Sequence, residues 1–187
     1  MDTPLFLVFL AVHIISLIVG MGAVFLIDTF GLLWLLGKMR LSFVVRVAHV
    51  TQWLIWLGWT GLVLSGTGLI VLKGYIDSLT MIKLFFVALL GANGIFLHGI
   101  KKTMEAFAEQ DVLPLFVRFR IGLSSGISQL GWWGAAAIGF LHRHWQHRID
   151  WPEAPELYMI GIIVLILATA LMGEILLRRE KRMYAST

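Results

Sequence analysis

Five apolar segments, each long enough to cross a lipid bilayer, constrain this chain more than any other feature. A transmembrane helix needs about 20 predominantly apolar residues, and 59% of the 187 residues are hydrophobic while only 14% are charged. The sequence therefore predicts an all-α, polytopic membrane helical bundle, with residues 1–187 forming a single integral membrane domain. The predicted spans cover residues 5–27 (continuing through 30–36 if the first helix is overlong), 43–72, 79–100, 119–141 and 157–177.

The basic residues predict how the bundle is oriented, since cytoplasmic loops are enriched in Lys and Arg. Eleven of the fifteen basic residues fall at one end of the alternating spans. This asymmetry predicts an N-terminus outside, a C-terminus in the cytoplasm, and a place in the inner (cytoplasmic) membrane. Because these residues flank apolar spans and form no patch, nucleic-acid binding is excluded. The eleven are Lys38, Arg40, Arg46, Lys101, Lys102, Arg118, Arg120, Arg178, Arg179, Lys181 and Arg182.

Four histidines lie inside or at the edge of the first four spans: His13, His49, His98 and His142. An ionisable side chain at membrane depth is costly and marks a functional site by default. Neutral imidazole is also a common axial ligand of haem iron. The chain has no cysteine, which excludes disulfides, covalently attached c-type haem and iron–sulfur clusters. The pattern favours one or two b-type haems with histidine ligands, in a four-helix core plus one further helix.

Depth divides these histidines into two pairs. At about 1.5 Å per residue, His49 lies roughly 9 Å and His98 roughly 4–5 Å from the cytoplasmic edge. Because these two lie on different helices at comparable depth, they form the better-matched pair for a bis-histidine haem. His13 lies roughly 13–14 Å in from the outer side, whereas His142 lies at the outer mouth of its span, so this second pair is less well matched.

Small residues accompany the histidines, as Gly91 and Gly94 share a helix face with His98. Such a face would let a flat macrocycle approach the helix. Small residues are also common wherever transmembrane helices pack, so histidines that serve only packing remain an alternative. Two other polar residues, Lys83 and Asp28, each allow two interpretations. Lys83 either snorkels to the interface or handles charge, and Asp28 either transfers protons or marks the end of the first span.

Two stretches of the chain resemble known families of small membrane proteins. Residues 82–90 (IKLFFVALL), followed by Lys101 and Lys102, resemble the third span of the membrane-integral (HemJ-type) protoporphyrinogen oxidases. Residues 12–15 (VHII), followed by Gly20 and Gly22, are similar to that family's first span and to the CopD-type copper-resistance membrane proteins.

The resemblance covers about the first hundred residues. It implies a small helical bundle that binds b-type haem, with functional roles for His13 and Lys83.

The leading hypothesis is an integral membrane protein that binds haem b and transfers electrons, with a quinone or another membrane protein as redox partner. One alternative is an enzyme of tetrapyrrole oxidation, a membrane oxidoreductase in which Lys83 or Asp28 handles charge or protons. Another is a CopD-like copper or metal transporter, and a third is an accessory subunit whose histidines are structural. Contact with the lipid bilayer follows from each of these, and association of several copies of the chain stays open.

Overall fold

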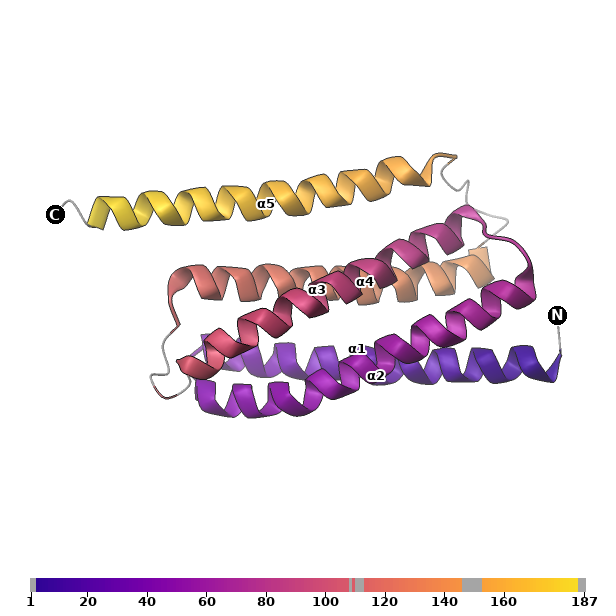
Figure 1. The fold of residues 1–187 in the computed structure, drawn as a ribbon, viewed down its shortest axis with the longest axis horizontal. Helices are drawn as coiled ribbons and strands as arrows, with labels where there is room; N and C mark the ends of the chain where they lie inside the picture. Colours follow the sequence, from indigo (N-terminus) through magenta and orange to yellow (C-terminus); the bar gives the residue numbers. More distant parts are fainter. Residues whose placement is uncertain (1–2, 108, 110–112, 146–152, 185–187) are drawn as a thin grey trace.

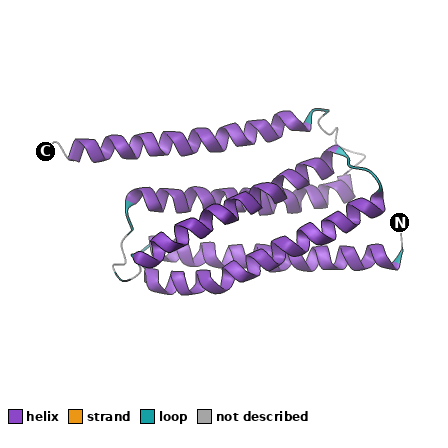
Figure 2. Ribbon diagram, in the orientation of Figure 1, coloured by secondary structure: helices purple, strands orange, loops and turns teal. Residues whose placement is uncertain are grey.

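The protein consists of five long helices connected by short segments (Figure 1). The computed structural model describes residues 3–107, 109, 113–145 and 153–184, of which 142–145 and 179–184 are described by their backbone alone. Within these residues all regular structure is helical (Figure 2). The helices are α1 (Pro4–Leu35), α2 (Leu41–Lys73), α3 (Ser78–Ala106), α4 (Leu115–Trp145) and α5 (Pro155–Tyr184).

The prediction of five helices is confirmed, and four of them are long and apolar enough to cross a membrane. These four are α1, α2, α3 and the 155–178 part of α5. The remaining helix, α4, has 31 residues but includes polar residues such as Ser124, Ser128 and Gln129 in its middle. The first helix continues without a break through Asp28 to Leu35, so it is the overlong helix that its sequence suggested.

Residues at the helix ends explain where the chain turns. Pro4 begins α1, where its missing N–H costs nothing because the first amides of a helix have no internal partner. Gly37 and Gly74 adopt positive φ angles of 69° and 79° directly after α1 and α2, a conformation that glycine reaches without strain. Asp77 caps α3 by accepting a hydrogen bond from the Thr80 amide at 2.9 Å. At each turn the chain reverses, so successive helices run in opposite directions along the bundle (Figure 1).

The two most closely packed helices are α1 and α2, and small residues allow the approach. A Cβ atom on Gly58 would lie 2.6 Å from the Gly20 Cα atom and 2.8 Å from the Ser16 carbonyl oxygen. Gly20 also faces the indole of Trp132 from α4, which is only 1% exposed. Close backbone contact across small residues is how transmembrane helices gain packing energy, since lipid provides no hydrophobic driving force between them.

The outer surfaces of the helices are strongly apolar. Large side chains such as Ile18, Leu64 and Val164 are more than half exposed, which suits contact with lipid chains. The helix α5 lies along one side of the bundle (Figure 1), and none of its most apolar stretch is buried. Its polar contact with the bundle is the ion pair of Glu174 with Arg120 of α4. Glu174 also lies 3.5 Å from Arg178, which belongs to α5 itself.

Candidate functional site

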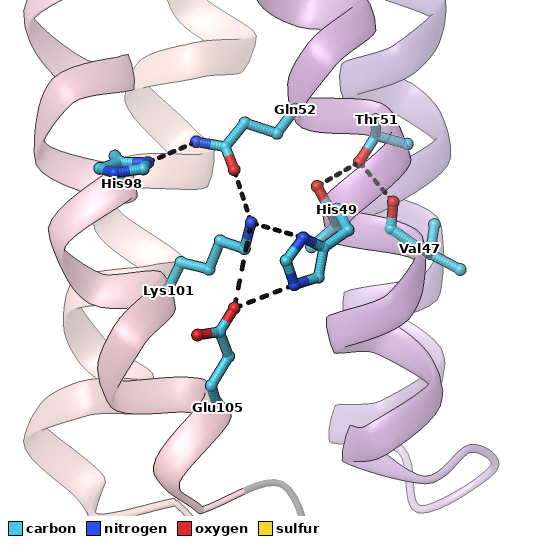
Figure 3. Close-up of polar contacts among 8 residues, drawn as sticks. Val47, His49, Thr51, Gln52, His98, Lys101 and Glu105 are labelled. Atoms are coloured by element: carbon cyan, nitrogen blue, oxygen red, sulfur yellow. Dashed lines mark hydrogen bonds and ion pairs between the residues drawn. The ribbon is translucent and has the colours of Figure 1, made fainter.

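A network of five polar side chains joins α2 to α3 at the end of the bundle that contains the α1–α2 turn (Figure 3). Lys101 is at its centre, with Nζ 2.9 Å from His49 Nδ1 and 2.9 Å from Gln52 Oε1. Glu105 Oε1 lies 3.0 Å from His49 Nε2 and 3.9 Å from Lys101 Nζ. Gln52 Nε2 lies 2.8 Å from His98 Nδ1. The expected grouping of His49 with His98 thus has a structural basis, but other side chains mediate it.

The direction of each hydrogen bond follows from the lysine, because an ammonium group only donates. Lys101 donates to His49 Nδ1, so the Nε2–H of His49 donates to Glu105. Lys101 also donates to Gln52 Oε1, which leaves the Gln52 amide N–H to donate to His98 Nδ1. A neutral His98 therefore carries its proton on Nε2. Both nitrogens of His49 are engaged, and the nitrogen of His98 that points away from Gln52 is protonated.

An axial histidine needs an unprotonated nitrogen facing the iron, and here the unprotonated nitrogens of His49 and His98 face Lys101 and Gln52. Their pairing on a haem therefore stays a prediction that requires these contacts to change. The glycine face of α3 is also filled. A Cβ atom on Gly91 would lie 2.7 Å from the Trp59 ring, and one on Gly94 would lie 3.2 Å from the Trp56 ring. The space that the sequence suggested for a macrocycle is occupied by two indole rings from α2.

His13 has the opposite arrangement, at the other end of the bundle. Its Nδ1 lies 3.0 Å from Ser65 Oγ in α2, and Ser65 Oγ in turn donates to the Gly61 carbonyl at 2.5 Å. A hydroxyl has only one hydrogen to donate, so Ser65 must accept the Nδ1–H of His13. Ser65 is 1% exposed, which keeps water from competing. Because Nδ1 carries the proton of a neutral His13, Nε2 carries the lone pair of the ring. The backbone of Leu62 in α2 also interacts with this imidazole.

Charged groups lie near His13 at this end of the bundle. Lys83 of α3 is half-buried and close enough to His13 to act on it electrostatically. Lys73 Nζ donates to Asp77 Oδ2 at 2.8 Å. Partial burial opposes ionisation of Asp77, but hydrogen bonds from Lys73 and Thr80 outweigh it and hold the pKa of this carboxyl far below its usual range. Lys83 interacts electrostatically with both Lys73 and Asp77, so the charged neighbour of His13 itself lies near a second ammonium group and a carboxylate.

Asp28 and His142 are the two remaining predicted site residues, and the structure describes the side chain of Asp28 alone. Asp28 lies on α1 and accepts a hydrogen bond from Gln129 Nε2 of α4 at 2.6 Å, while Gln129 Oε1 accepts from the Trp133 indole N–H at 2.9 Å. Asp28 is therefore inside a helix and partnered, and it does not end the helix. The side chain of His142 lies outside the described residues, so its pairing with His13 stays a prediction.

A further buried polar contact holds α3 against α4. Asn93 Nδ2 donates to the Ser124 carbonyl at 2.8 Å and to Ser128 Oγ at 2.9 Å, and all three residues are buried. The small polar side chains of α4 thus serve the packing of α3 against α4. This contact leaves the Ser124 hydroxyl buried without a hydrogen-bond partner in the described part of the chain.

Sequence reasoning missed several partners that decide how the histidines behave. Ser65, Lys101, Glu105 and Gln129 each lie opposite a predicted site residue, and all four contacts join residues more than 50 positions apart in the chain. The one local signal is the i,i+4 spacing of Lys101 and Glu105, which suits an ion pair on a single helix. This spacing indicates that Lys101 and Glu105 share one face of α3. It does not indicate that His49 of α2 lies opposite them.

Comparison of the chain with protein-family models, with curated proteins and with solved structures finds no match. No group of three or more His, Cys, Asp or Glu side chains suited to a metal ion occurs within the residues that the structure describes. The chemistry of the site must therefore be argued from the arrangement of its side chains alone.

Proposed function

We propose that this protein binds b-type haem in the membrane and transfers electrons, with His13 as an axial ligand. The observation that carries the proposal is the hydrogen-bonded series from His13 Nδ1 to Ser65 and on to the Gly61 carbonyl. Metal-ligating histidines almost always donate their second ring N–H to a protein acceptor, which fixes the tautomer and the ring orientation. His13 meets this requirement, while His49 and His98 would have to give up their present hydrogen bonds.

Ser65 and Lys83 are the neighbours of His13 that would help to hold the group. Haem supplies one-electron chemistry when it is bound. Ser65 orients the imidazole and raises its basicity, and the ammonium group of Lys83 offers a counter-charge for a haem carboxylate. His142 remains the candidate for the opposite axial position, and a quinone or another membrane protein remains the candidate redox partner. The predicted orientation places this region toward the outer face of the cytoplasmic membrane.

The test is the absorption spectrum and the haem-to-protein ratio of the purified protein from haem-replete cells. We expect a b-type spectrum for the wild type, its loss in His13→Ala and its retention in His49→Ala. Ser65→Ala should keep the haem but change its reduction potential, because the ring would lose the acceptor that orients it. A colourless wild-type protein, or a His13→Ala protein with unchanged haem content, would refute the proposal.

A second candidate function is oxidation of a tetrapyrrole substrate. It is favoured by the proximity of Lys83 and His13, since the family resemblance implies roles for both residues. Lys83→Met retains much of the side-chain length and removes the charge. If the enzyme reading holds, wild-type chain should restore growth to a strain that lacks protoporphyrinogen oxidase, and Lys83→Met with normal haem content should not. Failure of the well-expressed wild type to restore growth would exclude this candidate and leave electron transfer.

A further inference from the structure

The turn between α1 and α2 forms an open pocket with three basic residues in its lining. The cavity has a volume of about 610 Å³, and its basic residues are Lys38, Arg40 and Arg46. No acidic side chain of the described residues lines it. Trp34 and Phe43 form its aromatic part. It lies where α1 ends at Leu35 and α2 begins at Leu41, at one end of two helices that are long and apolar enough to cross a membrane.

Within the residues that the structure describes, no carboxylate neutralises the charges in this pocket. Elsewhere in the described structure Lys73 pairs with Asp77, Lys101 with Glu105, and Arg120 with Glu174. The three basic side chains of the pocket make no ion pair with any described residue. Unlike α1 and α3, α2 begins without a side-chain cap. Its first turn contains no acidic residue, so the partial positive charge of its N-terminus adds to the same field.

We infer that this pocket binds the phosphate group of an anionic phospholipid. Guanidinium and ammonium groups are the side chains that recognise phosphate, the arginines through paired hydrogen bonds. Basic pockets between transmembrane helices bind anionic headgroups. Aromatic side chains at the headgroup level anchor a helix there. The acyl chains would extend along the exposed apolar surface of α1, where Leu32 and Leu35 are each more than half exposed. Soluble phosphate shares the headgroup chemistry but makes no use of that surface.

The experiment compares the full chain with two triple variants in nanodiscs that contain phosphatidylglycerol and phosphatidylcholine. The pocket variant carries Lys38→Gln, Arg40→Gln and Arg46→Gln. The control carries Lys102→Gln, Arg179→Gln and Lys181→Gln, which removes the same charge from outside the pocket. Nanodiscs present both leaflets, so the result does not depend on how each variant inserts. Circular dichroism checks that the helices are retained, and Arg46→Gln alone replaces the pocket variant if that protein does not fold.

Native mass spectrometry then gives the relative affinity for each lipid. We expect the preference for phosphatidylglycerol to fall roughly tenfold or more in the pocket variant, since each basic residue at a charged surface contributes an appreciable share of binding. The control should change the preference for phosphatidylglycerol less than about twofold, well under the tenfold change expected for the pocket variant. Equal losses in both variants would show general charge attraction and overturn the inference. If inorganic phosphate displaced the lipid at equal concentration, the inference that the ligand is a lipid would be overturned. None of these outcomes depends on haem.

Discussion

Replacing Gly58 with Ala tests the closest contact in the bundle. The added Cβ would lie 2.6 Å from both the Cα and N atoms of Gly20, whereas ordinary contact begins at 3.4 Å. The two helices would therefore have to separate by about 0.8 Å (3.4 minus 2.6). The neighbouring atoms are backbone, so no side-chain rotation relieves the overlap. We expect a loss of about 3 kcal/mol in the free energy of unfolding, at the upper end of the range for overpacked sites.

The same separation should disturb the His13 site. His13 Nδ1 and Ser65 Oγ are 3.0 Å apart across the α1–α2 contact, and a further 0.8 Å exceeds the hydrogen-bonding range. If the protein binds haem through His13, Gly58→Ala should also shift its spectrum or reduction potential.

The assay is reversible unfolding in mixed detergent micelles, followed by circular dichroism, with Gly22→Ala as the matched control. A Cβ atom on Gly22 meets nothing within 4 Å, and alanine has the higher helix propensity by about 1 kcal/mol. The control should therefore be neutral or slightly more stable, opposite in sign to Gly58→Ala. Equal stability of the two variants would refute the close approach of α1 and α2.

Two further changes test polar contacts. Asn93→Leu removes the hydrogen bonds to the Ser124 carbonyl and to Ser128 Oγ. Each bond contributes on the order of 0.6–1 kcal/mol, so the free energy of unfolding should fall by about 1–2 kcal/mol. An unchanged thermal midpoint would contradict this. Asp77→Asn retains the α3 cap but loses the charge pairing with Lys73. The depressed pKa of Asp77 means that its contribution is present at neutral pH, declines once the pH falls below the carboxyl's ordinary value, and is lost through the folded-state pKa. The wild type should therefore lose stability more steeply than Asp77→Asn as unfolding is measured below about pH 4, and parallel curves would contradict the assignment.

The sequence by itself determined the helices, because a membrane-length apolar run has few alternatives to a helix once every backbone group must be hydrogen-bonded internally. It also grouped His49 with His98, since rise per residue converts position into depth.

Which nitrogens of each histidine are engaged was decided only by tertiary structure. His49 and His13 look alike in the sequence, each a single imidazole in an apolar helix. Lys101 and Glu105 engage both nitrogens of His49, whereas Ser65 accepts a hydrogen bond from Nδ1 of His13, so the lone pair of a neutral His13 is on Nε2. The physical reason is that hydrogen-bond direction depends on which donor or acceptor a neighbouring helix places opposite each ring nitrogen, and that placement comes from helix packing.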